Sequence, residues 1–367
     1  MSCIVCSFLH GVYCAIDCST TVQPFGAPAV PPHQTGIQKA YLMNYIVMDL
    51  EWNQCPYGKK REDPKMPFEI IEIGAVKVDD SFTPQDTFHE IVRPVLYTRL
   101  HHCTRTVIHM TEEDFRGKRS FPEVFTDFLA WCGNDPLFCT WGPGDLTELQ
   151  RNAAWHIARG TLGGPWPFAY PLFFRDIQKI FSHACEDGRS RRSLQWAVEF
   201  LNLSEEEQFH GAYADAVYTA EVLRRIPRDM VERYSSIDTY ITPKSRAEEI
   251  FVRYDTYTKF ISRSYRDRDD VMKDRVITAT RCPDCGKKAP RKIRWFSENG
   301  RNFLSVSLCP DHGLIKGKIR IRQNAEGEWF AIRTIRKITP EEMETVRKKK
   351  EAVRLKRKAR TVQPQKA

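Results

Sequence analysis

A short apolar stretch at residues 45–51 carries two acidic side chains on one face of a predicted β-strand. Every second residue from 46 to 50 is a large apolar one, and Asp49 and Glu51 occupy two of the intervening positions. Because side chains two residues apart on a strand project from the same face, the two carboxylates converge, while the aliphatic side chains anchor the opposite face. Two neighbouring acids on such a strand cost stability unless a cation or hydrogen bonds compensate their charge. The stretch therefore predicts a core strand, and the pair of acids does not by itself specify a cation site.

Two further motifs place polar side chains at the start of predicted helices. In residues 140–149 a strand ends, Gly and Pro turn the chain, and Asp145 opens a helix, where it could equally serve as the N-cap. In residues 209–215, His210 precedes a helix and Asp215 lies a little over one turn along it. A histidine before a helix is also typical of a polar surface position. Neither motif specifies a function by itself.

Residues 43–226 mix strand and helix patterns, which predicts an α/β domain. Three consecutive strands with short connections indicate an antiparallel meander, and helices with one more short strand follow. The predicted strands are 45–51, 69–78, 87–93 and 137–141, and the predicted helices are 121–131, one that begins near Asp145, and 212–225.

In combination, these motifs resemble the DEDD exonucleases. Four acids appear in the order, spacing and local context of that superfamily, and a histidine stands five residues before the last acid. The pattern is most similar to the histidine subfamily, which includes RNase T, oligoribonuclease and the polymerase III proofreading subunit. Tyr213 lies only two residues from the last acid, which disfavours the tyrosine subfamily. The residues that carry the resemblance are Asp49, Glu51, Asp145, His210 and Asp215.

The flanking sequence is most similar to the Eri-like exonucleases, whose best-known members trim RNA ends. The similar stretches are 49–54, 72–76 and 91–94. The resemblance covers roughly residues 43–226. Two stretches depart from it: residues 56–67 read as an inserted loop, and residues 106–109 stand where relatives often have a Thr-Gly-Ile turn. Both departures concern the substrate cleft rather than the metal ligands.

The resemblance implies an RNase H-like fold, a mixed five-stranded sheet flanked by helices, with two divalent cations at the active site. Phosphodiester hydrolysis needs an activated water and a stabilised leaving oxygen, and two Mg²⁺ or Mn²⁺ ions supply both. Asp49 would bridge the ions, with Glu51 and Asp215 on the side of the nucleophile and Asp145 on that of the leaving group. His210 is the candidate general base, because the pKa of a histidine lies near working pH.

These inferences predict a metal-dependent 3′→5′ exonuclease that acts on single-stranded 3′ ends. RNA is slightly favoured over DNA on resemblance alone, because recognition of the 2′-hydroxyl depends on the cleft. A DNA proofreading exonuclease is one alternative. A non-catalytic nucleic-acid-binding protein on a nuclease scaffold is another, although the retention of all four acids and the histidine argues against it.

The C-terminal part contains a separate metal-ligand pattern. A CxxC pair and a CxxH pair share the same Pro-Asp interior and are 23 residues apart. Three thiolates and one imidazole make a closed tetrahedral set, which predicts a structural Zn²⁺ without an open coordination position. The four ligands are Cys282, Cys285, Cys309 and His312.

Positive charge is concentrated in the same part of the chain. Of the net charge of +9, residues 271–367 carry +16, with 26 Lys and Arg against 10 Asp and Glu, so the remainder carries −7. Residues 318–322 and 332–338 alternate isoleucine with basic residues, which indicates strands with one basic face. The aromatic residues Trp295, Phe296, Trp329 and Phe330 are candidate stacking platforms. We interpret this part as a nucleic-acid-binding module; a protein-docking module, aromatics that form a small core, and a solvated basic tail remain alternatives.

The chain divides into an N-terminal extension, two structured parts and their connections. The extension combines a Pro-rich stretch with almost no charge and is expected to be disordered or non-native; an irregular zinc site from Cys3, Cys6, Cys14 and Cys18 is an alternative. The first basic residue is Lys39 and no run of 18 apolar residues occurs, so we expect neither a secretory signal nor a membrane span, and a cytoplasmic protein. The predicted parts are the extension 1–42, the exonuclease domain 43–226, a connecting segment 227–275, a zinc-binding basic β module 276–340 and a basic helical tail 341–367.

Overall fold

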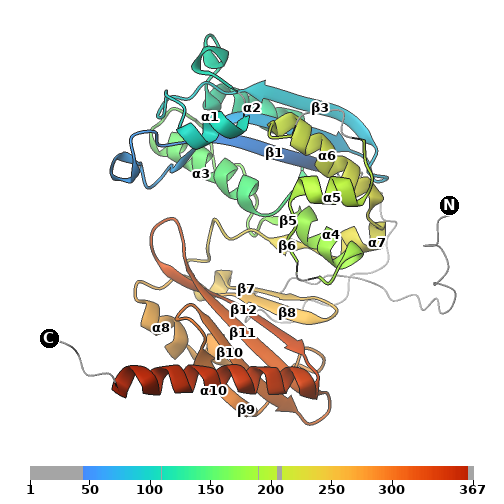
Figure 1. Cartoon of the computed structure of the whole chain (residues 1–367), viewed down its shortest axis with the longest axis vertical. Helices are drawn as coiled ribbons and strands as arrows, with labels where there is room; N and C mark the ends of the chain where they lie inside the picture. Colours follow the sequence, from blue (N-terminus) through green and yellow to red (C-terminus); the bar gives the residue numbers. More distant parts are fainter. Residues whose placement is uncertain (1–43, 109, 189, 205–208, 363–367) are drawn as a thin grey trace.

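Two β-sheets, each accompanied by helices, make up the chain (Figure 1). The computed structural model describes residues 44–108, 110–188, 190–204 and 209–362. The predicted extension 1–42 lies outside these described residues, as does its alternative zinc site. None of the helices in the described ranges combines the length and apolar character that a membrane crossing requires.

The first sheet has the strand order β3-β2-β1-β4-β5-β6. Its strands are β1 (Tyr45–Gln54), β2 (Phe68–Val78), β3 (Pro84–Ile91), β4 (Leu137–Thr140), β5 (Phe173–Asp176) and β6 (Ser236–Ile237). The predicted meander β1-β2-β3 is antiparallel, whereas β4 pairs with β1 and β5 pairs with β4 in parallel. The RNase H-like mixed sheet is therefore confirmed, with one strand more than the five expected. The extra strand β6 has only two residues and comes from the segment predicted as a connection.

Helices cover both faces of this sheet. They are α1 (His102–Ile108), α2 (Phe121–Cys132), α3 (Gly144–Ala158), α4 (Ile177–Cys185), α5 (Leu194–Phe200), α6 (Ala212–Arg225) and α7 (Arg228–Arg233), with 3-10 turns η1 (Lys59–Arg61) and η2 (Glu112–Phe115). The aliphatic face of β1 packs in one core with α2 and α3. Its other face begins with Tyr45 and Val47, which pack with α4, α5 and α6. The two acids of β1 follow on this second face, so they lie on the side of the sheet that α6 covers.

The second sheet is antiparallel throughout, with the order β7-β8-β12-β11-β10-β9. Its elements are β7 (Ile250–Arg253), β8 (Tyr257–Ile261), β9 (Arg291–Ser297), β10 (Asn302–Cys309), β11 (Gly313–Gln323), β12 (Trp329–Lys337), α8 (Arg268–Lys273), α9 (Arg275–Thr278), α10 (Pro340–Val362) and the 3-10 turn η3 (Arg246–Glu248). The predicted strands 318–322 and 332–338 lie within β11 and β12, which pair with each other. The segment 227–275, which carried no functional interpretation, supplies β7 and β8 to this sheet.

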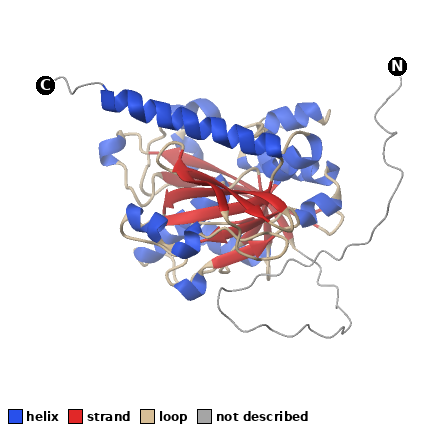
Figure 2. Ribbon diagram, turned by 90° about the horizontal axis from the view of Figure 1, so that it is seen from below, coloured by secondary structure: helices blue, strands red, loops and turns tan. Residues whose placement is uncertain are grey.

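The long helix α10 lies along the outside of the second sheet (Figure 2). Its side chain Val346 is buried against Ile293 of β9 and Leu304 and Val306 of β10. Of the aromatic residues predicted as stacking platforms, Phe296 and Phe330 are buried in the core instead. Each of these two rings packs in an apolar cluster of the second sheet, which removes it from water and from stacking on a base.

Candidate active site and metal centre

The acids of the first motif meet the last acid at one point. Ligand oxygen atoms of Asp49, Glu51 and Asp215 all lie within 4.8 Å of one another. Asp49 and Glu51 come from β1, whose pairing with β2 shifts register after Glu51, and Asp215 comes from the first turn of α6. Asp145 is buried and close enough to raise the pKa of Asp49. The structure therefore brings all four predicted acids to one region.

Asp145 does not take the N-cap position that was its alternative interpretation. Helix α3 begins at Gly144, its N-cap residue is Pro143, and no side chain caps its N-terminus. Asp145 thus lies within the first turn, where backbone hydrogen bonds from Leu50 and from Asp145 itself hold its carboxylate and lower its pKa against the larger effect of burial.

Charge repulsion and burial keep this cluster from ionising easily. Burial, together with the neighbouring acids, raises the pKa of Glu51 to about 8 and holds that of Asp49 well above its ordinary value. Burial likewise raises the pKa of Asp145 to about 7 and that of Asp215 above its usual range. The Oδ1 atom of Asp215 is buried without a hydrogen-bond partner in the described part of the chain. An oxygen-only donor set of this kind fits a hard divalent cation, which would relieve both the repulsion and the unsatisfied oxygen.

Gly74 allows α6 to approach the acidic strand. In the β1–β2 register Gly74 is the partner of Asp49. A Cβ atom at this position would lie 2.2 Å from the backbone carbon of Ala212 and 2.2 Å from the backbone nitrogen of Tyr213. Only glycine tolerates such contact with a helix backbone. Gly74 therefore sets the distance between Asp215 and the acids of β1.

His210 lies beside Asp215 at the entrance to α6. Its backbone has φ 71°, an uncommon conformation for a residue other than glycine, although histidine is among the residues enriched there. The His210 backbone N–H and its ring both act to lower the pKa of the Asp215 carboxyl, against the larger opposing effect of burial. The side chain is exposed. A left-handed residue thus presents a solvent-accessible imidazole next to the acid cluster.

A fifth carboxylate, which the sequence interpretation did not single out, borders the cluster. Glu72 is the register partner of Glu51 and is 3% exposed. Its Oε1 atom lies 2.8 Å from Nε2 of His89, and this hydrogen bond raises the pKa of His89. The His89 ring in turn stacks on Tyr213 of α6, with ring centroids 5.2 Å apart. A charged residue within the otherwise apolar stretch 70–76 was the signal that could have identified Glu72.

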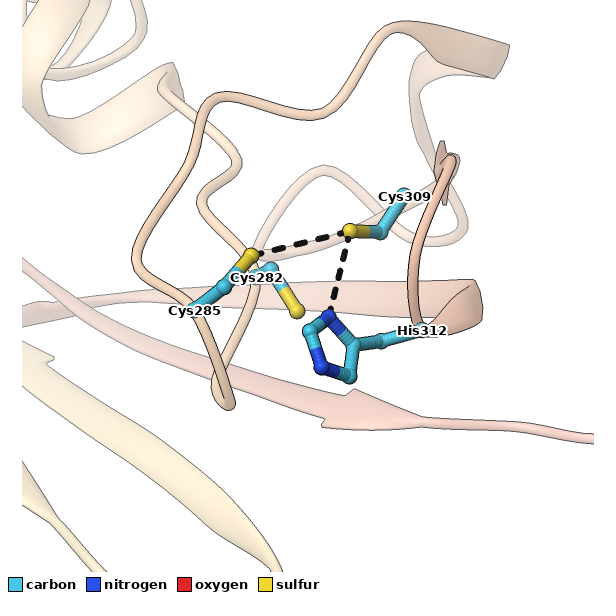
Figure 3. Close-up of side chains that lie close together, drawn as sticks. All are labelled: Cys282, Cys285, Cys309 and His312. Carbon is cyan, nitrogen blue, oxygen red and sulfur yellow. Dashed lines mark hydrogen bonds between the residues drawn. The ribbon is translucent and has the colours of Figure 1, made fainter.

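The predicted zinc ligands form a second cluster, shown in Figure 3. Ligand atoms of Cys282, Cys285, Cys309 and His312 all lie within 4.8 Å of one another. Sγ of Cys309 is 3.7 Å from Sγ of Cys285 and 3.6 Å from Nδ1 of His312. A tetrahedral zinc with bonds of about 2.3 Å to sulfur and about 2.0–2.1 Å to nitrogen would hold these pairs about 3.8 Å and about 3.6 Å apart. The geometry therefore fits a zinc ion.

The aspartates of the two Pro-Asp turns connect this cluster to its surroundings. Asp284 pairs with Lys337 of β12 at 2.9 Å, and Asp311 pairs with Lys287 at 3.0 Å. Arg253 of β7 donates to the backbone carbonyl of Asp284 at 2.7 Å. Both turns are thereby positioned by groups outside the ligand set, as is usual around metal sites.

Comparison with known protein families gives a match over the first part of the chain. Residues 46–223 match the RNase_T family model, described as Exonuclease, and this span contains all four acids and His210. The match covers just under half of the chain, and its ends agree closely with β1 and α6. No curated protein matches the chain.

Several solved structures are similar to part of the chain. A full-length 3′-exonuclease is 20% identical over 53% of this chain and 85% of its own, with a TM-score of 0.42. The nuclease domain of 3′hExo, a DEDDh family member bound to rAMP, is 22% identical over 54% of this chain and 98% of its own, with a TM-score of 0.44. A 3′-exonuclease in a structure of histone mRNA stem-loop recognition is 19% identical over 58% and 92%, also with a TM-score of 0.44.

The family match defines the class of protein. The part of the chain that holds the carboxylate cluster is an exonuclease domain. The predicted enzyme is thereby confirmed as an exonuclease, and an exonuclease domain implies dependence on a divalent metal.

Proposed function

We propose that this chain is a two-metal exonuclease of the DEDD histidine subfamily, similar to the Eri-like enzymes, which removes nucleotides from single-stranded 3′ ends and prefers RNA slightly over DNA. The observation that carries the proposal is the convergence of Asp49, Glu51 and Asp215 within 4.8 Å, with His210 beside them. Two residues of β1, one of α6 and one just before α6 reach this point from distant parts of the sequence, which a purely structural role would not require.

Each residue of the cluster has a distinct part in this proposal. Bound divalent cations would supply an activated water and stabilise the leaving oxygen. Asp49 would hold both ions, Glu51 and Asp215 the ion on the nucleophile's side, and Asp145 that on the leaving-group side. His210 would accept the proton of the attacking water, for which its exposed ring next to Asp215 is suitably placed.

The proposal predicts activity that depends on metal and on a free 3′ end. With EDTA present, hydrolysis of a labelled single strand should cease, and Mg²⁺ or Mn²⁺ should restore the release of mononucleotides. Because the pKa of Glu51 is about 8 and that of Asp145 about 7 before metal binds, protons compete with the cation. The metal concentration for half-maximal activity should therefore fall as the pH rises through this range.

A circular strand of the same sequence is the control, and its cleavage at a comparable rate would contradict an exonuclease. Hydrolysis undiminished by EDTA would contradict the metal site. Binding without any hydrolysis under all metal conditions would favour the non-catalytic alternative. Strands that end in a single ribonucleotide or deoxyribonucleotide, and are otherwise identical, test the RNA preference at the bond cleaved.

We further propose that the cysteine–histidine cluster holds a structural zinc. Zinc binding contributes about 10–16 kcal/mol in small zinc-finger peptides, which is comparable to the whole stability of a typical domain, about 5–15 kcal/mol. Cys309→Ala should therefore lose the bound zinc and unfold the second sheet, measured as metal content and as a lost thermal transition. Cys185→Ala, at a half-buried cysteine outside the cluster, is the control. Full stability of zinc-free protein would exclude a structural role for the metal.

A further inference from the structure

A groove lies between the exonuclease domain and the second sheet. Its volume is about 700 Å³, within the usual range of ligand sites. One wall comes from β5, α4 and the residues that follow α4, and the other from β8, β11 and β12. Eight lining side chains are basic and two are acidic: Lys179, Arg191, Lys259, Lys316, Lys318, Arg320, Arg322 and Arg336, against Asp176 and Asp238.

The strand pattern explains why one wall is so basic. Along β11 the isoleucines are buried, and the alternate positions, which carry its four basic side chains, share the opposite face. In the β11–β12 register Lys316 stands directly opposite Arg336, a like-charge pair that is unfavourable without a counter-ion. On the same face, the apolar residues of β10 are covered by α10. The half of this face that carries the basic side chains of β11 is left open towards the exonuclease domain.

The groove cations have few partners of their own. Among the described residues, Arg336 is the only one of the eight in an ion pair, which it forms with Glu342. Burial, with Lys179, Arg322 and Arg320 nearby, lowers the pKa of Lys259 to about 8. Burial also lowers the pKa of Lys316 and Lys318, and neighbouring cations lower both further. Cations held together at this cost indicate a site that an anion completes.

The groove begins close to the candidate active site. Pro143 and Thr147, which stand two residues on either side of Asp145, both line it. Arg320 and Arg322 of the groove also line a second hollow of about 540 Å³, together with Arg301 and Trp329. Of the four aromatic residues predicted as stacking platforms, Trp329 alone lines one of the hollows found among the described residues. A basic path thus runs from the start of α3 towards an aromatic ring.

We propose that this groove holds the sugar–phosphate backbone of a single strand whose 3′ end occupies the active site; this inference rests on the proposed exonuclease function. Alternate residues of a strand are about 6.6–6.8 Å apart, so the four cations of β11 form a row with a spacing comparable to the phosphates of an extended single strand. A volume of this size suits a few nucleotides of one strand rather than a duplex. The substrate is accordingly a 3′ end preceded by several unpaired nucleotides.

The test measures binding by the full chain in EDTA, so that hydrolysis does not enter. A labelled single strand of about 16 nucleotides, at the upper end of usual site sizes, is titrated at several salt concentrations. The double variant Lys318→Gln, Arg320→Gln removes two groove cations. The matched control Lys292→Gln, Arg294→Gln removes two exposed cations from β9, two strands away from β11.

The groove variant should weaken binding about tenfold or more and lower the salt slope by about 0.7 for each cation removed. The control should bind within about twofold of the unaltered chain, since residues outside the contact contribute only through screened long-range charge. Equal losses in both variants would show diffuse attraction and overturn the proposal. Equal affinity for a duplex of the same sequence would overturn the assignment to a single strand.

Lys259→Met separates binding from folding. Because this lysine is desolvated among other cations, its removal should leave the unfolding temperature unchanged or higher while weakening the binding of the single strand. A lower unfolding temperature accompanied by weaker binding would mean that Lys259 serves the fold, against the proposal. Strand binding that depends on the groove, without hydrolysis in Mg²⁺ or Mn²⁺, would refute the exonuclease function only. If the chain hydrolyses the strand but the groove variants bind it normally, only the proposed binding of the strand in the groove is refuted.

Discussion

His210→Ala is expected to lower turnover by about 10²–10⁴-fold while metal binding stays near normal, because a general base moves a proton without holding the metal. Asp49→Ala should instead weaken metal binding and turnover together, since Asp49 lies within 4.8 Å of both Glu51 and Asp215. Calorimetric metal titration beside single-turnover kinetics measures the two effects separately.

The backbone of His210 supplies the control for this experiment. At φ 71° an alanine is strained, whereas a glycine is not. His210→Gly should therefore keep the stability of the unaltered protein, and its turnover should fall by the same factor as that of His210→Ala. If the glycine variant recovers the rate, the alanine variant fails through its backbone. If either variant turns over within a few-fold of the unaltered enzyme, His210 is not the general base.

Gly74→Ala is expected to reduce turnover by about 10²-fold or more, although Gly74 carries no functional group. Its new methyl group would lie 2.2 Å from the backbone of α6, so the helix must move outward by more than about 1 Å. Displacements of that size in a positioned catalytic group cost about this much in rate. Metal affinity should fall as well, because Asp215 moves away from the acids of β1.

Gly163→Ala is the matched control, since a Cβ atom there meets nothing within 4 Å. Overpacking at Gly74 should also cost about 1–3 kcal/mol of unfolding free energy. Thermal unfolding identifies the temperature range in which the Gly74→Ala protein stays folded, and its rate is compared there. A folded variant with normal rate and metal affinity would show that α6 does not need this close contact.

Local sequence patterns were sufficient for several elements and for the identity of the clustered residues. The alternation in residues 45–51 predicted β1 and the shared face of Asp49 and Glu51. The helix predicted at 212–225 matches α6, and the CxxC and CxxH turns predicted a zinc-ligand set whose atoms do meet. Each of these features depends on residues within one or two turns or on one strand, where the geometry of the element fixes which side chains lie together.

The connecting segment shows where such reasoning stops. Residues 227–275 contain β6, β7 and β8, which have two, four and five residues. Strands this short carry too few alternations to stand out, and their stability comes from partners distant in the sequence, such as the pairing of β8 with β12.

Local patterns identified the four acids, His210 and the zinc ligands, whereas long-range packing set what surrounds them. Glu72 joins the acid cluster because of the β1–β2 register, and Gly74 matters because α6 crosses it. The basic groove exists only because β5, α4 and Arg191 on one side face β8, β11 and β12 on the other. Periodicity states which face of a strand a side chain occupies, but the opposite wall is set by long-range packing, which no local pattern encodes.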